Sequence, residues 1–261
     1  MSDGCKKLFG KVAIVTGGSS GIGRAIAIAF AENGAKVVVA DIRDSPRENT
    51  TNTVEEIGKL GIESFFKKTD VSDEKSVSEL IESCVERYGK LDILVNNAGI
   101  TSIKSALEMT GEEFLNILNV NVKGAFLGSK YALKYMVKQK KGKIINLASN
   151  FSFTALGNIS AYVTSKTAVL GLTRALAIEF APFGINVNAV SPGATKTEFT
   201  RPFWDDSAGL QELATRTPLR KNGEFLVKPS DIGKAAVFLA SDDSDMMTGT
   251  SILIDGGWNA W

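Results

Sequence analysis

The chain has 261 residues, of which 44% are hydrophobic and 23% charged, and this ordinary globular composition excludes a disordered chain. Its 30 Lys and Arg residues balance 29 Asp and Glu residues, so no basic excess points to a nucleic-acid partner. It contains no histidine, which excludes Ser–His–Asp and Cys–His catalysis and every His-ligated metal site. Any catalysis would use Tyr, Lys, Ser, Asp or Glu side chains or a bound cofactor, and no metal is expected.

Seven short runs rich in apolar residues alternate with helical patterns along the chain. They are Val12–Val15, Lys36–Ala40, Glu63–Phe66, Leu91–Val95, Lys143–Leu147, Ile185–Val190 and Thr250–Ile254. Most of these runs are apolar throughout, which is typical of strands buried on both faces of a parallel sheet. We therefore expect one doubly wound α/β domain over residues 1–261, with a seven-stranded parallel sheet flanked by helices.

The predicted helices begin and end at recognisable residues. Gly34 is expected to end the first helix, and Ser72 is expected to cap a second predicted helix that ends at Gly89. Two longer helices are predicted over Glu112–Val137, as one uninterrupted helix, and over Ser160–Ala181, which is apolar on nearly every side. The second of these should be buried on two faces.

No feature of the sequence indicates a membrane or an oxidising compartment. No apolar run approaches the length of a membrane span, and Met1–Gly10 lacks the apolar core of a signal peptide. Cys5 and Cys84 are too few for a disulfide framework, which suits a reducing environment. The expectation is a cytoplasmic protein.

A glycine-rich turn, Thr16–Gly23, follows the first strand and opens the first helix. Its glycines allow close backbone approach, and the helix N-terminus offers free N–H groups to a dinucleotide pyrophosphate. A tight turn without any ligand is the alternative. Asp41 ends the second strand about 20 residues later, where a carboxylate can bind an adenosine ribose and repel a 2′-phosphate. This favours NAD, although Arg43 could serve NADP.

Tyr162 and Lys166 are four residues apart on a helix, so they share one face. Ser149 ends the fifth strand, and ligands bind at this edge of open α/β sheets. An ordinary pair of amphipathic side chains is the alternative explanation for Tyr162 and Lys166.

Together these residues resemble the short-chain dehydrogenase/reductase family, from about Leu8 to Gly257. The matching motifs are Thr16–Gly23, Asn96-Asn97-Ala98-Gly99, Asn121 in Asn121-Val122-Lys123-Gly124, Ser149, Tyr162-x-x-x-Lys166, and Pro192-Gly193 followed by Thr195 and Thr197. The resemblance implies a Rossmann-like fold and an NAD-dependent oxidoreductase that acts on alcohol or carbonyl compounds.

The resemblance also assigns catalytic roles. Tyr162 would be the acid/base, and its pKa would have to fall from about 10 towards neutrality. Lys166 and the oxidised nicotinamide would favour the phenolate, and Lys166 would also hold the nicotinamide ribose. Ser149 would bind the substrate oxygen, and Asn121 would anchor a water in the proton path.

The implied cofactor contacts come from the strand ends and from the turns that follow them. They are Gly17, Ser20, Gly21, Ile22, Gly23, Asp41, Asp70, Val71, Asn97, Tyr162, Lys166, Pro192, Gly193, Thr195 and Thr197. Thr195 stands where the family more often has an aliphatic residue, and a backbone contact would survive this change.

The substrate is less well determined. The longest irregular segment, Ala194–Lys228, is expected to form a lid over the site. Aromatic residues in the lid and after Ser149 predict a pocket for a hydrophobic small molecule, or else they pack the lid onto the body: Phe151, Phe153, Phe199, Phe203 and Trp204. A 3-oxoacyl-thioester reductase, a sugar 1-dehydrogenase and a non-catalytic nucleotide sensor are the alternatives.

Assembly is implied by the resemblance, since the family commonly pairs its two long helices between subunits. A dimer or, preferably, a homotetramer is expected. Trp258 and Trp261 could reach a neighbouring subunit or pack locally.

Overall fold

A seven-stranded parallel sheet lies at the centre of the computed structural model, which describes residues 6–201, 205, 207–221 and 223–260. The strand order is β3-β2-β1-β4-β5-β6-β7. The bounds are β1 Val12–Thr16, β2 Lys36–Asp41, β3 Ser64–Lys68, β4 Ile93–Asn96, β5 Gly142–Leu147, β6 Ile185–Pro192 and β7 Ser251–Ile254. All seven predicted strands and the predicted fold class are confirmed.

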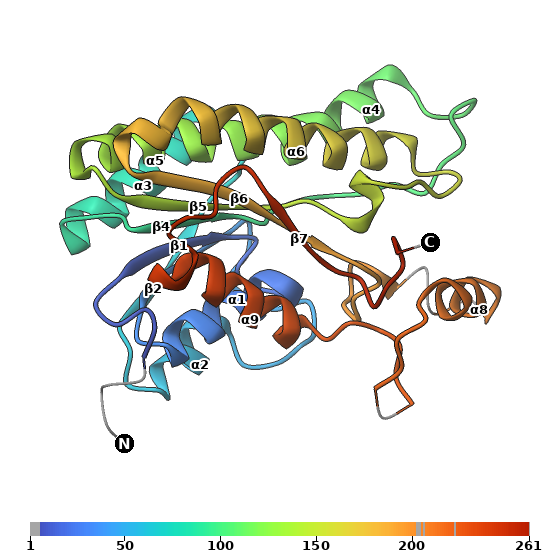
Figure 1. Ribbon diagram of the computed structural model, residues 1–261, viewed down its shortest axis with the longest axis horizontal. Helices are drawn as coiled ribbons and strands as arrows, with labels where there is room; N and C mark the ends of the chain where they lie inside the picture. Colours follow the sequence, from blue (N-terminus) through green and yellow to red (C-terminus); the bar gives the residue numbers. More distant parts are fainter. Residues whose placement is uncertain (1–5, 202–204, 206, 222, 261) are drawn as a thin grey trace.

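Helices cover both faces of this sheet (Figure 1). On one face lie α1 (Gly21–Glu32), α2 (Thr53–Gly58) and α9 (Pro229–Ala240), and on the other α3 (Glu74–Tyr88), α5 (Gly124–Gln139) and α6 (Ser160–Phe180). Phe30 and Ile232 belong to the first apolar layer, and Leu80 and Met136 to the second. Most strands are rich in apolar residues because they contribute side chains to both layers.

The order of strands reverses beside β1, which pairs with β2 on one side and with β4 on the other. Loops that leave the carboxyl ends of two such neighbours run in opposite directions, which opens a crevice for ligands. The fold therefore places the glycine-rich turn after β1 and the residues after β4 on the two walls of one crevice.

The long helix predicted over Glu112–Val137 is wrong in its middle. The structure has α4 (Gly111–Leu118), then a π-helical turn over Asn119–Lys123, and then α5. The Gly124 N–H donates to the Asn119 carbonyl oxygen, five residues back instead of four. The turn therefore contains one residue more than a regular α-helix would have there. The Asn121 side chain within it makes hydrogen bonds to Ile100 and Ser165.

Two smaller expectations about the helices also change. Asp73, rather than Ser72, caps α3, because its carboxylate accepts from the Lys75 N–H at 3.1 Å while the Ser72 hydroxyl donates to Asp70. The helix ends at Gly89 as predicted. α6 buries one face only, and Ile178 on its other side is 78% exposed. Among the described helices, none is long and apolar enough to cross a membrane.

The segment Ala194–Lys228 is only partly irregular, since a lid of this length can contain short helices. It contains α8 (Ser207–Arg216), and its two ends are joined by backbone hydrogen bonds. Lys196 N–H donates to the Val227 carbonyl oxygen at 3.1 Å, and Val227 N–H donates to the Ala194 carbonyl oxygen at 2.8 Å. The segment is therefore a loop tied at its base beside the carboxyl end of β6.

Candidate active site

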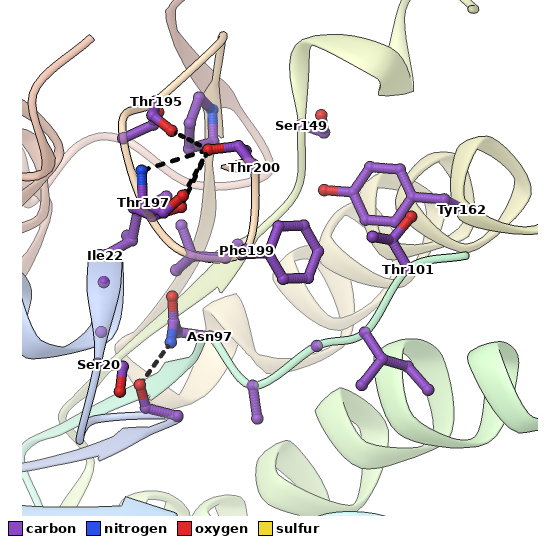
Figure 2. A pocket seen from close by; sticks show the side chains of 18 of the residues that line it. Ser20, Ile22, Asn97, Thr101, Ser149, Tyr162, Thr195, Thr197, Phe199 and Thr200 are labelled. Carbon is purple, nitrogen blue, oxygen red and sulfur yellow. Dashed lines mark hydrogen bonds between the residues drawn. The ribbon is translucent and has the colours of Figure 1, made fainter. Parts of the chain in front are cut away.

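One cavity of about 430 Å³ lies at the carboxyl edge of the sheet and gathers nearly all the predicted site residues. Figure 2 shows the glycine-rich turn on one side and Ser149 and Tyr162 on the other. The predicted residues that line the cavity are Gly17, Ser20, Gly21, Ile22, Gly23, Asp41, Asp70, Val71, Asn97, Ser149, Tyr162, Lys166, Pro192, Gly193, Thr195 and Thr197. Asn121 is the exception.

The glycine-rich turn is closely packed. Gly17 has φ 64°, in the left-handed region, and a Cβ there would lie 2.7 Å from Asn97 Nδ2. A Cβ at Gly23 would overlap the Gly17 carbonyl oxygen. Asn97 Nδ2 donates to the carbonyl oxygens of Thr16 and Gly17, at 2.8 and 3.2 Å. The Asn97 amide therefore holds the turn in shape, a role that the sequence did not predict.

An acidic side chain already lies at the N-terminus of α1. The Gly21 N–H donates to Glu48 Oε1 at 2.7 Å, and Glu48 lines the cavity. A carboxylate at this position is an anion on the free N–H groups of a helix. The site therefore fits the phosphate of a dinucleotide, because the same N–H can donate to another anion. Glu48 was missed because it lies in an irregular segment with no motif.

Asp41 presents a fixed carboxylate next to this turn. Its Oδ2 accepts from the Ser19 N–H at 3.2 Å, and its Oδ1 accepts from the Ile42 N–H at 2.8 Å. Arg43 contributes its carbonyl oxygen to the Ser19 hydroxyl, at 2.7 Å, and its side chain is exposed. The acidic group at the end of β2 is therefore oriented by the backbone of the glycine-rich turn.

The loops after β3 and β6 supply the remaining predicted residues at this end of the cavity. Asp70 and Val71 line the cavity after β3, and the Asp70 carboxylate accepts from the N–H and the hydroxyl of Ser72. After β6 the Thr195 hydroxyl donates to the Gly193 carbonyl oxygen at 2.9 Å, and Thr197 lies beside it (Figure 2). The backbone there is held by local hydrogen bonds.

Tyr162 and Ser149 face each other across the other end of the cavity (Figure 2). The Ser149 hydroxyl donates to Asn150 Oδ1 and accepts from the Phe151 N–H, both at 3.1 Å. Burial raises the pKa of the Tyr162 hydroxyl to about 12, and a hydrogen bond with Ser149 opposes this shift. The lowered pKa expected from the sequence is therefore not produced by the residues of the chain.

Lys166 lies deep beneath Tyr162. Its Nζ is 5.8 Å from the centre of the Tyr162 ring and donates to the Leu147 carbonyl oxygen at 2.7 Å. The residue is 5% exposed, and burial lowers the pKa of its ammonium to about 8. With a pKa of about 8 the ammonium is still mostly protonated at neutral pH, and its hydrogen bond goes to the backbone rather than to the Tyr162 hydroxyl.

The Asn121 side chain does not line the cavity and makes three hydrogen bonds within the chain. Its Nδ2 donates to the Ile100 carbonyl oxygen and to the Ser165 hydroxyl, at 3.0 and 2.9 Å, and its Oδ1 accepts from the Ile100 N–H at 2.8 Å. These bonds connect the π-helical turn to the strand-end segment and to α6. Both amide N–H groups are therefore used within the chain, and a water in a proton path would have only the backbone and the amide oxygen of Asn121 as partners.

Aromatic side chains surround the substrate end. Phe199, in the segment after β6, packs 6.0 Å from Tyr162 between ring centres, and Figure 2 shows it facing the Tyr162 ring. Phe151 and Trp258 meet edge to face at 5.8 Å, and Trp258 is buried, so it packs locally within this chain. Phe153 is 52% exposed and does not line the cavity, contrary to expectation. Phe203, Trp204 and Trp261 lie outside the described residues.

The chain is similar to known proteins over almost its whole length. A family model described as enoyl-(acyl carrier protein) reductase matches residues 17–259. An uncharacterized oxidoreductase of Thermotoga maritima is 42% identical, covering 96% of this chain and 98% of its own. The 2-dehydro-3-deoxy-D-gluconate 5-dehydrogenase of Dickeya dadantii is 39% identical over 97% of each chain. Zerumbone synthase of Zingiber zerumbet is 38% identical over 97% of this chain and 96% of its own.

Solved structures agree with these relatives. A short-chain type dehydrogenase/reductase from Mycobacterium marinum has a TM-score of 0.89, with 38% identity over 98% of each chain. A candidate NAD(P)-dependent gluconate 5-dehydrogenase from Beutenbergia cavernae, with NADP bound at low occupancy, has a TM-score of 0.90. It is 36% identical and covers 99% of this chain and 100% of its own.

Proposed function

Because the chain belongs to the short-chain dehydrogenase/reductase family, we propose that it transfers hydride between NAD(H) and a hydrophobic secondary alcohol or ketone. Members of this family are oxidoreductases that act on alcohol and carbonyl groups with a nicotinamide cofactor. The observation that carries the proposal is the shared cavity. The glycine-rich turn and Asp41 line one end, and Tyr162 and Ser149 line the other.

The nicotinamide cofactor would supply the hydride acceptor or donor and, when oxidised, a positive charge beside Tyr162. Tyr162 would take up or release the proton at its phenolic oxygen. Ser149 would turn its hydroxyl from Asn150 Oδ1 to the oxygen of the substrate. Lys166 would exchange the Leu147 carbonyl for the ribose hydroxyls, and the Asn121 backbone would support a proton-carrying water.

The preference for NAD is supported by Asp41, whose carboxylate is oriented by two backbone N–H groups. Such a carboxylate would hydrogen-bond the adenosine ribose and repel a 2′-phosphate. The exposed side chains of Arg43 and Arg47 are nearby positive charges that could serve NADP, and one similar solved structure has NADP bound.

The hydrophobic substrate class is supported by the apolar side chains at the far end of the cavity, which are Phe151, Ile159, Phe199, Leu213, Leu226 and Trp258. A sugar-acid substrate is the second candidate. Thr101, Asn116 and Glu198 also line the cavity and could bind hydroxyl groups, and the Dickeya relative is named for such a substrate.

Homotetramer formation is also part of the proposal. Apolar side chains remain exposed on the two long helices, with Phe126 on α5 45% exposed and Ile178 on α6 78% exposed. Burying such faces against another copy would be favourable.

The test is a panel of cyclic and aromatic secondary alcohols, sugar acids and 3-oxoacyl thioesters, assayed with NAD(H) and NADP(H). The expected result is turnover of hydrophobic alcohols with NAD and weak turnover of the other classes. Efficient turnover of sugar acids alone would replace the first candidate with the second, and turnover of neither would reject both.

A further inference from the structure

The connection between β2 and α2, residues 42–52, folds back onto the glycine-rich turn. The Ser19 hydroxyl donates to the Arg43 carbonyl oxygen at 2.7 Å, and the Arg47 N–H donates to the Ser20 hydroxyl at 2.8 Å. Both bonds join the connection to the turn that would carry the cofactor phosphates. The connection therefore forms one rim of the cofactor end of the cavity.

A short turn within this connection presents Glu48. The Asn49 N–H donates to the Pro46 carbonyl oxygen at 3.3 Å, and Asn49 has φ 51°, a left-handed conformation that Asn tolerates. The Glu48 side chain then reaches the first N–H of α1, where its Oε1 accepts from Gly21 at 2.7 Å. No described residue donates a hydrogen bond to Glu48 Oε2, although this oxygen is buried.

The two oxygens of the Glu48 carboxylate differ in their hydrogen bonding, since Oε1 accepts from Gly21 and Oε2 accepts from no described residue. A carboxylate on a helix N-terminus is favourable, because the N–H groups there carry partial positive charge. A buried oxygen without a donor is unfavourable, because it has lost its water without replacement. Such a half-satisfied carboxylate is readily displaced by an anion that makes more hydrogen bonds.

We propose that Glu48 is an internal competitor of the cofactor. Its carboxylate occupies the N-terminus of α1, and a cofactor phosphate must displace it before binding. The Gly21 N–H cannot serve both anions, so only the fraction of molecules with Glu48 displaced can bind the cofactor. If Glu48 occupied the helix end nine-tenths of the time, the apparent Kd would be about tenfold weaker than the intrinsic one.

This role is separable from cofactor selection at Asp41. NADH and NADPH share the same pyrophosphate, so displacement of Glu48 weakens both to the same degree. Asp41 acts at the ribose, where the two cofactors differ. A change at Glu48 should therefore shift both Kd values by one common factor and leave their ratio unchanged.

The experiment is a fluorescence titration with NADH and with NADPH in the absence of substrate. Glu48→Gln removes the charge with little change in shape and should lower both Kd values at least threefold. Glu48→Asp keeps the charge but is one methylene shorter, so it should also tighten binding. Stopped-flow mixing should assign the gain mainly to faster association. Glu56→Gln is the matched control, since it removes a carboxylate of α2 that pairs with Lys59, the residue that follows this helix. It should leave both Kd values unchanged.

Unchanged or weaker binding by folded Glu48→Gln, checked by a thermal melt, would overturn the proposal, and weaker binding would make Glu48 a ligand of the bound cofactor. If Glu56→Gln lowered both Kd values as much as Glu48→Gln, the change in net charge would explain the effect, and this result would also overturn the proposal. The titration uses the cofactor alone, so failure to find an alcohol substrate would leave its outcome unaffected.

Discussion

The Lys166 ammonium donates a hydrogen bond to the Leu147 carbonyl oxygen, 2.7 Å away, at the end of β5. The bond connects the face of α6 that carries Tyr162 and Lys166 to the strand that precedes Ser149. It also holds a charged group in a position that is 5% exposed. Burial of this charge opposes folding as long as the group is protonated.

A pH-dependent difference in stability should follow at Lys166. Its pKa is lowered to about 8 by burial, against an ordinary value of 10.5. Between these values the unfolded chain binds more protons than the folded one, so stability rises with pH. Relative to Lys166→Met, the wild-type free energy of unfolding should rise by about 1–2 kcal/mol from pH 8 to 9.5 and stay level below pH 7. Urea unfolding of both proteins measures this. A difference independent of pH would contradict the assigned shift.

Tyr162→Phe should abolish turnover and leave NADH binding nearly intact. The change keeps the ring that packs against Phe199 and removes only the transferable proton. The expected loss in kcat is about 100-fold or more. Tyr135→Phe, which removes a hydroxyl on α5 outside the cavity, is the control and should retain full activity. Retention of more than about a tenth of the wild-type rate by Tyr162→Phe would remove Tyr162 from the chemistry.

Asp41 should determine the choice of cofactor. The wild-type kcat/KM should favour NAD over NADP at least tenfold, about 1.4 kcal/mol, and Asp41→Ala should reduce this ratio. Steady-state kinetics with both cofactors provide the ratio. Asp44→Ala is a suitable comparison, because Asp44 is an exposed carboxylate in the same connection that does not line the cavity. If both variants changed the ratio equally, general charge rather than the Asp41 position would explain it.

The segment 194–228 should open and close over the site as a tied loop. Its ends are joined between Ala194 and Val227, so we expect motion within the loop and a fixed base. Limited proteolysis should cut inside it without NADH, and saturating NADH should slow the cutting several-fold. Mass spectrometry of the fragments identifies the sites. Equal rates with and without NADH would argue against a lid.

The sequence predicted the strands and the layers of the fold better than the irregular turn within one of its helices. Buried parallel strands are rich in apolar residues, so all seven could be recognised without knowing their partners. The π-helical turn at Asn119–Lys123 could not, because it depends on hydrogen bonds between the Asn121 amide and Ile100, far from it in the chain. Helix periodicity is a local signal, and this contact is not local.

The same reason explains what was found and missed at the site. Motifs at strand ends placed Ser149 and the glycine-rich turn on one cavity, because parallel strands bring their carboxyl ends to one edge, and Tyr162 was placed there by its motif on the next helix. Glu48 has no such pattern, since its position depends on how residues 42–52 fold back. The direction of the Lys166 side chain could not be predicted either. It depends on the buried Leu147 carbonyl oxygen, to which the ammonium donates a hydrogen bond.

The π-helical turn makes α4 and α5 two helices that differ in phase by one residue. An α-helix rotates roughly 100° per residue, so deleting any one residue of 119–123 would restore regular α-helical hydrogen bonding. The deletion would at the same time rotate α4 by roughly 100° relative to α5. A chain shortened in this way would gain a better helix and lose the joint between Asn121, Ile100 and Ser165. The extra residue of the π-helical turn thus sets the rotation between α4 and α5 at which Asn121 can bond to Ile100 in the segment after β4.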